Sequence, residues 1–162
     1  MAKFQVGKGL DEYLATLGNL EFKAPDVCGL AIYQGAKVVA DQIKANIEAL
    51  PVSATKGGNQ GRRNPTQAEK DGLIEGLGIA RKQNDNGYIN VKIGMDGYNS
   101  DVTAKYPKGK PNAMIARSIE SGTTFMNRIP FISRAVNATK AAAEEAMREE
   151  VDKQISQIMG NG

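Results

Sequence analysis

The chain has 162 residues, of which 24% are charged, and a formal net charge of +3 at pH 7. This length suits one domain with a single core, and no apolar run approaches the roughly 18 residues that a membrane span requires. The absence of histidine removes the commonest general base, and a lone cysteine excludes an internal disulfide and a structural zinc site, so we expect neither an enzyme nor a cofactor.

The first part of the chain, residues 10–50, predicts two helices. The apolar stripe of the first consists of Leu10, Tyr13, Leu14 and Leu17. This helix should end near Gly18, and Pro25 with Asp26 favours a new helix start that runs to Pro51. The stripe of the second helix consists of Val27, Ala31, Gly35, Val39, Ile43, Ile47 and Leu50. Its small residues favour close helix packing within the chain, although a subunit contact would use them equally well.

Two further expectations concern the N-terminal residues and the single cysteine. Residues 1–7 lack the apolar run of a secretory signal peptide, so we expect synthesis in a cytoplasm. The lone Cys28 has apolar neighbours in the sequence, and free cysteine is among the most buried residue types. We therefore expect Cys28 to be buried.

Residues 51–65 predict a mobile loop. Glycine, serine and asparagine alternate here with Lys56, Arg62 and Arg63, and such a composition buries too little apolar surface to offset the entropy of ordering. The cations have no aromatic residue among them on which a base could stack, so a solvated loop is favoured over a nucleic-acid surface. Ordering of the loop against a neighbouring subunit is the second alternative.

A short helix over residues 66–76 and a β-hairpin over residues 77–94 come next. Asn86-Gly87 is the strongest short signal for the turn of a hairpin. The hairpin residues expected to face the core are Ile89, Val91 and Ile93. Because an isolated hairpin is only marginally stable, it should pack on the long helices or pair with a further strand, from residues 98–110 or from another subunit.

Residues 96–110 predict a polar turn followed by a second basic loop. Asp96–Asp101 has closely spaced oxygen side chains but lacks the bidentate Glu and the spacing of a calcium-binding loop. The candidate cations for a DNA channel or a partner loop are Lys56, Arg62, Arg63, Lys105, Lys108 and Lys110. They would face DNA or simply keep the loops solvated, and solvation is favoured for any single lysine.

The final third predicts two helices joined by a tight corner. Ala113–Ile119 has helical spacing, Gly122 should end that helix as a left-handed C-cap, and Pro130 should open the last helix, which runs to Met159. The stripe of the last helix is Phe131, Ala135, Thr139, Ala143, Met147, Val151, Ile155 and Met159. Because strict i, i+4 spacing drifts around a straight helix, the buried face should rotate along its length. Its outer face is acidic.

At this corner the sequence resembles a known family. Ile119-Glu120-Ser121-Gly122-Thr123, then Pro130-Phe131-Ile132 and Ala135, resembles the E-x-G-T … P-F-(hydrophobic)-x-x-A pattern of the HK97 gp10-like family of tailed bacteriophages. Asp71-Gly72-Leu73-Ile74 and the segment Gly94–Asn99 look like the variants found in phages of Gram-positive hosts. The resemblance covers residues 65–158.

The resemblance implies a structural protein of the phage head–tail neck, a tail completion or head–tail joining protein. Such a protein forms a homo-oligomeric ring, commonly hexameric, around the DNA channel between the portal complex and the tail tube. Its partners would be neighbouring neck and tail proteins, with DNA only as channel contents, and it would reside in the virion after assembly in the host cytoplasm. The positions that match the family pattern, or adjoin it as a subunit interface, are Glu120, Gly122, Thr123, Phe125, Pro130 and Phe131.

By matching position, Glu120 and Thr123 would fix the turn or an adjoining contact, and Phe131 would anchor the last helix in the core. The residues themselves predict an α+β fold, with a small antiparallel sheet packed against two long helices and long flexible loops. Two other functions remain open: a basic nucleic-acid-binding module and a protein that interacts with a host factor. The net charge of +3 and the missing aromatic platform argue against tight binding of nucleic acid.

Overall fold

The computed structural model describes residues 8–54 and 61–160. Within these residues the chain forms four helices and four short strands. They are α1 (Lys8–Glu48), α2 (Gln67–Gly76), β1 (Leu77–Ile79), β2 (Gln83–Asp85), β3 (Tyr88–Asn90), β4 (Ile93–Met95), α3 (Asn112–Ser121) and α4 (Phe131–Gly160). This is the predicted α+β fold, in which a small antiparallel hairpin accompanies two long helices.

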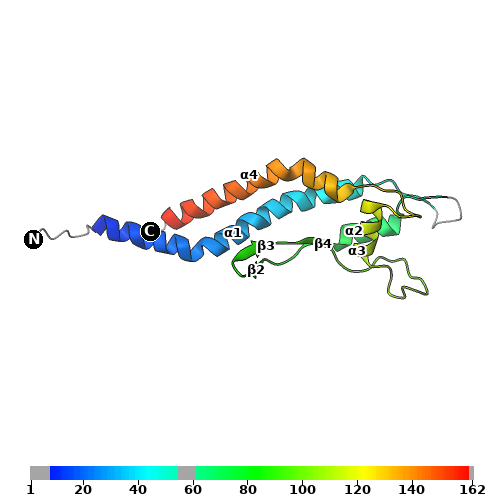
Figure 1. Cartoon of the computed structure of the whole chain (residues 1–162), viewed down its shortest axis with the longest axis horizontal. Helices are drawn as coiled ribbons and strands as arrows, with labels where there is room; N and C mark the ends of the chain where they lie inside the picture. Colours follow the sequence, from blue (N-terminus) through cyan, green and yellow to red (C-terminus); the bar gives the residue numbers. More distant parts are fainter. Residues whose placement is uncertain (1–7, 55–60, 161–162) are drawn as a thin grey trace, which may run out of the picture.

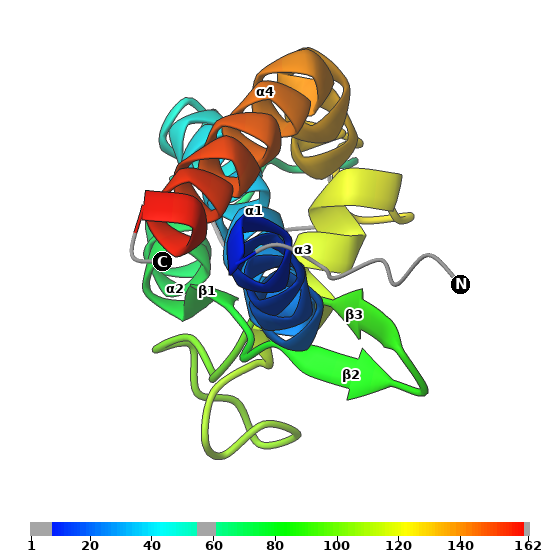
Figure 2. The same ribbon diagram turned by 90° about the vertical axis from the view of Figure 1, so that its left-hand side faces the viewer.

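The molecule is elongated. Helices α1 and α4 run antiparallel, and α2 and α3 lie at one end of the pair (Figure 1). Viewed along the long axis, α1 lies between α4 and the β2–β3 hairpin (Figure 2). We call the end that contains α2 and α3 the base. We call the opposite end the arm, where the first part of α1, around Thr16 to Leu30, lies beside the last turns of α4.

The main hydrophobic core lies in the base, although Val27 and Ala31 are also buried along the contact between α1 and α4. Its most buried members come from all four helices and from the residue pair after α1, and are Ile43, Ile47, Leu50, Leu73, Ile115, Ile119, Phe131 and Ala135. In the arm, small residues let the two long helices approach closely. A Cβ atom at Gly35 would lie 2.7 Å from Cγ of Met147 on α4. The packing of this α1 stripe within the chain is therefore confirmed.

Helix α1 is continuous, so the predicted break between Gly18 and Pro25 is wrong. Proline inside a helix removes one backbone hydrogen bond and costs about 3 kcal/mol. Beyond Pro25, however, α1 buries Val27 and Ala31 beside α4. A helix that continues through the proline keeps both segments on one axis, and the long contact with α4 offsets the lost bond.

The continuous helix also explains why Cys28 is exposed rather than buried. Val27 and Ala31 occupy the face of α1 that meets α4, and Cys28 lies about 100° around the helix from Val27. The prediction of a buried Cys28 was wrong because apolar neighbours in sequence do not share a face on a helix.

The hairpin forms as predicted but in two short ladders. β1 pairs with β4 and β2 pairs with β3, both antiparallel, around a turn at Asn86 and Gly87 with φ of 54° and 91°. Both positive φ values fit the mirror-image turn that Asn-Gly favours. The hairpin packs on α1, where Lys82 Nζ lies 2.8 Å from Asp26 Oδ1.

Residues 98–110 do not extend the hairpin as a further strand, as one alternative had it. Instead the segment closes on itself. The Asn99 N–H donates to the Lys110 carbonyl at 2.9 Å, and the Asn112 N–H donates to the Gly97 carbonyl at 3.0 Å. These two hydrogen bonds join the beginning of the segment to its end. The segment therefore forms a closed loop before α3, and these backbone groups are not free to pair with the hairpin.

Helix α4 confirms the expected rotation of its buried face. Phe131, Ala135, Thr139 and Ala143 are buried, but Met159 at the end of the same stripe is 48% exposed. Near the tip, Gln154 and Ile158 face α1 instead.

Candidate interaction surfaces

The corner, residues 120–131, joins α3 to α4. Gly122 ends α3 with φ 73° and ψ 159°. The predicted stop is therefore correct. The predicted left-handed C-cap conformation is wrong, because ψ is extended rather than helical. An extended ψ at positive φ is essentially restricted to glycine. The chain leaves the helix at once, and the Thr123 N–H donates to the Met126 carbonyl at 3.0 Å.

Replacing Gly122 with alanine is expected to lower the free energy of unfolding by about 1 to 3 kcal/mol. The new Cβ atom would lie 2.9 Å from the Arg128 Cβ, in addition to the backbone strain at positive φ. Chemical denaturation measures the effect. Gly94→Ala is the matched control, since a Cβ atom there has no neighbour within 4 Å. Equal stability of the two variants would contradict the prediction.

Thr123 fixes the shape of the corner. Its Oγ1 accepts from the N–H groups of Phe125 and Met126, at 3.2 and 3.0 Å. The carbonyl of Phe125 accepts from the N–H of Arg63 at 2.9 Å. The backbone of Phe125 is thus held on both sides, yet its side chain is 76% exposed.

Glu120 caps the start of α4. Its carboxylate accepts from the N–H groups of Ile132 and Ser133, at 2.8 and 3.0 Å, and from the Ser133 hydroxyl. Burial opposes ionisation of Glu120, but these hydrogen bonds outweigh it and hold the pKa of the carboxyl below its ordinary value. Pro130 immediately precedes the helix, and Phe131 is only 2% exposed, so its role as a core anchor is confirmed.

A second polar cluster lies on the other side of α3, around Glu69. The Arg63 guanidinium binds both Glu69 carboxylate oxygens at 2.7 Å, and Lys110 Nζ lies 3.4 Å from Oε1. Glu69 and Thr66 also form a reciprocal capping box at the start of α2. The Glu69 side chain is 2% exposed, so this carboxylate is buried but fully paired.

Two of the six candidate cations, Arg63 and Lys110, are thus engaged by Glu69. Both ends of the 51–65 loop are also fixed, since the Ser53 N–H donates to the Pro65 carbonyl at 3.0 Å. Lys56 lies outside the described residues. Arg62, Lys105 and Lys108 are exposed, which leaves them open to DNA or a partner protein.

The Asp96–Asp101 segment is the predicted polar turn. Asn99 organises it, because its Oδ1 accepts from the N–H groups of Asp101 and Lys110, at 3.2 and 2.9 Å. In the part of the chain that the structure describes, no three His, Cys, Asp or Glu side chains gather as a metal site would need. None of the described helices is long and apolar enough to cross a membrane.

An apolar groove of 460 Å³ opens between α1, β4, α3 and α4. Its main apolar walls are Val39, Ile43, Ile93, Ala116, Ile132 and Val136. Arg117, which is exposed, and Glu120 supply its charged lining. We refer to this feature as the groove.

A smaller hollow of 160 Å³ lies on the opposite flank of α3. Met114 and Ser118 line it together with Phe125 and the Glu69 cluster. On the helix, Ala113, Arg117 and Glu120 follow the i, i+4, i+7 spacing of one flank, whereas Met114 and Ser118 follow the other. Two unlike surfaces therefore flank the same helix.

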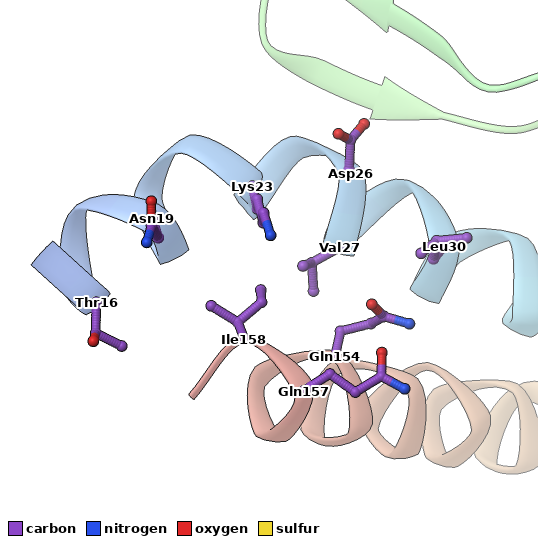
Figure 3. Close-up of a pocket in the computed structure, with 9 residues that line it drawn as sticks. All are labelled: Thr16, Asn19, Lys23, Asp26, Val27, Leu30, Gln154, Gln157 and Ile158. Atoms are coloured by element: carbon purple, nitrogen blue, oxygen red, sulfur yellow. The ribbon is translucent and has the colours of Figure 1, made fainter. Parts of the chain in front are cut away.

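A third recess of 310 Å³ lies in the arm, between α1 and the end of α4. In Figure 3, Val27 and Ile158 point toward each other across it, whereas Asp26 points away toward the hairpin. Polar side chains make up most of its remaining lining, including Asn19, Gln154 and Gln157. With Lys23 also in it, this mostly polar lining differs from the predominantly apolar lining of a small-molecule site.

The sequence reasoning missed Glu69 and the groove. A signal for Glu69 was present, since Thr66-x-x-Glu69 is a capping-box pattern. No short pattern could have indicated the groove, because its walls come from four elements far apart in the chain.

Comparison of the chain with protein-family models, with curated proteins and with solved structures finds no match. The resemblance of the corner to the HK97 gp10-like family therefore stays a prediction.

Proposed function

We propose that this chain is a structural subunit of the head–tail neck of a tailed bacteriophage, a tail completion or head–tail joining protein. Its subunits would form a closed homo-oligomeric ring, hexameric by analogy with the family, around the DNA channel between the portal complex and the tail tube. The corner motif, Glu120 to Phe131, suggests the family. One physical observation carries the expectation of assembly.

That observation is the large exposed surface of the subunit. The chain exposes 11170 Å², whereas a folded monomer of 17.3 kDa typically exposes about 7,800 Å². The chain is thus far from compact, and a permanent interface, which buries 2,000 to 5,000 Å², would cover a substantial share of its exposed surface. An elongated subunit with its core at one end would cover this surface by packing against further subunits.

The arrangement of surfaces favours a ring. Contacts between unlike surfaces on neighbouring copies are heterologous, and they close into a ring when the rotation between copies permits. The groove and the Phe125 side of the base are unlike surfaces on opposite flanks of α3. A two-fold dimer would instead place the same surface on both sides of its contact.

The charges fit a channel protein better than a tight DNA binder. With Arg63 and Lys110 engaged by Glu69, three of the candidate cations, Arg62, Lys105 and Lys108, are exposed among the described residues. Weak and sequence-independent attraction of this kind is compatible with DNA that passes through the ring as contents. The ring would reside in the virion neck after assembly in the host cytoplasm.

Light scattering of the purified full chain, with and without the adjoining neck proteins, tests this function. We expect a discrete closed oligomer, visible as rings by negative-stain electron microscopy. In phage that lack the chain, DNA-filled heads and finished tails should accumulate unjoined. A monomer under both conditions, or normal joining without the chain, would refute the proposal.

A further inference from the structure

The groove is an apolar site that no described part of its own chain fills. Its walls carry branched and small apolar side chains, with Val136 46% exposed at its edge. Arg117 lies among them, exposed and without an ion-pair partner among residues 8–54 and 61–160. A guanidinium beside an apolar recess is suited to an aromatic ring, which can stack on the cation while its edges enter the recess.

Phe125 has the properties of an anchor for such a recess. Most of its side chain, 76%, is exposed. Its backbone is nevertheless held through the Thr123 hydroxyl and the N–H of Arg63. A residue already fixed in position loses little conformational entropy on binding, and aromatic residues are common anchors at interface centres.

The two features are placed so that one subunit can both donate and accept. They lie on opposite flanks of α3, so the Phe125 side of one copy can face the groove of the next. Repeating the same rotation places every Phe125 against a neighbour's groove. Such a contact is heterologous and closes when the rotation divides a full turn.

We propose that Phe125 of each subunit inserts into the groove of the next copy of this chain and stacks on Arg117 there. This inference rests on the proposed ring and names its central contact. A buried phenylalanine covers about 150 to 250 Å², so it would be the centre of a contact whose remainder comes from the surrounding base. The large exposed surface of the chain leaves ample area for that remainder.

Phe22 is the competing anchor, since it is 86% exposed. It lies on the arm, 17 residues before Val39 of the groove, which is about 26 Å along α1. Between copies that lie parallel, a contact of Phe22 with a neighbour's groove would offset successive copies by that distance, as in an open filament. Phe125 lies in the base, as the groove does, and requires no such offset.

Site-directed cross-linking tests the contact. Cys28 is the only cysteine and is exposed, so Cys28→Ser provides a cysteine-free background. Full chains carrying Thr124→Cys, which keep the Phe125 ring and place the thiol on the adjoining exposed residue, are mixed with chains carrying Val136→Cys and treated with a short bis-maleimide. We expect a cross-linked heterodimer, and a chain with both cysteines should give a ladder that ends at the ring stoichiometry. Glu21→Cys, which keeps the Phe22 ring, mixed with Val136→Cys is the matched control and should give no specific product.

Light scattering of single variants provides a second measurement. Phe125→Ser should raise the dissociation constant between subunits about 30-fold or more, as loss of an interface anchor does. The melting temperature of the monomer should not change, because the side chain is exposed in the subunit. Phe22→Ser should assemble like the unmodified chain.

The outcomes separate this contact from the ring itself. A ring that persists in Phe125→Ser, together with no Thr124–Val136 product in chains that keep Phe125, overturns the contact but leaves the proposed function intact. Cross-linking from the Glu21 position in its place, with extended filaments, overturns the contact as well. An unmodified chain that remains monomeric at all concentrations, alone and with neck proteins, and gives no product overturns both.

Discussion

Replacing Glu69 with alanine is expected to lower the free energy of unfolding by about 3 kcal/mol, at the lower end of the cost of breaking a buried ion pair. The carboxylate is 2% exposed and is paired with Arg63 and Lys110, which are 18% and 26% exposed. Without it, two partly buried cations would face each other, and the Thr66 capping box at the start of α2 would be lost. The partial exposure of the cations limits the penalty.

Urea denaturation at pH 7 measures this effect. Asp71→Ala is the matched control, because Asp71 is an exposed carboxylate on the same helix, and among the described residues its side chain bonds only to Gln67. Exposed substitutions of this kind usually change stability by less than about 0.5 kcal/mol. If the two variants unfold at the same urea concentration, the Glu69 cluster does not stabilise the base.

The same carboxylate should make stability depend on acid. Burial opposes its ionisation, but hydrogen bonds from Arg63 and Thr66 and the nearby positive charges hold the pKa of Glu69 below its ordinary value of 4.5. A lowered pKa in the folded state means that this stabilisation is present above the unfolded pKa and is lost as pH falls through the folded pKa. Glu69→Gln should therefore lose less stability than the unmodified chain between pH 7 and strongly acidic pH.

The parts of the fold that the sequence predicted well depend on local geometry. Asn86-Gly87 specifies a tight turn through the φ values that its own residues prefer, and Gly122 and Pro130 mark the ends of helices in the same way. Phe131 follows from helical spacing next to these markers. Each signal lies within a few residues, so no knowledge of the rest of the chain was needed.

The errors arose where tertiary packing decides. Gly18 and Pro25 are local helix breakers, yet α1 runs through both because its following turns pack along α4. The exposure of Cys28 follows from the same continuous helix. Local propensity is a weak prior, and a long helix–helix contact outweighs it.

The candidate surfaces were accessible to sequence reasoning only in part. Phe125 and Glu120 were indicated by the corner, which is a local motif. Lys110 meets Glu69 across 41 residues, and the groove combines α1, β4, α3 and α4. Contacts of such separation have no short pattern, so the pairing of Arg63 and Lys110 and the shape of the groove required the fold.

A second large effect is expected at Gly76, the last residue of α2. A Cβ atom there would lie 2.2 Å from the Asp96 carbonyl oxygen and 2.7 Å from the Asn112 Nδ2. That amide donates to the same carbonyl at 2.7 Å, so the glycine lies where α2, the polar turn and the start of α3 converge. Neither the carbonyl nor the buried amide can move without breaking this hydrogen bond.

Gly76→Ala should therefore destabilise the chain by about 1 to 3 kcal/mol, the usual cost of overpacking, although alanine is about 1 kcal/mol the better helix former. Gly78→Ala, two residues further on, is the control, because a Cβ atom there meets open space and alanine suits a strand better than glycine. Thermal denaturation should thus lower the melting temperature of one variant and leave the other unchanged or raised. If both variants are stabilised, the Asp96 carbonyl does not lie close to Gly76 in solution. The base would then be packed more loosely than the structure shows.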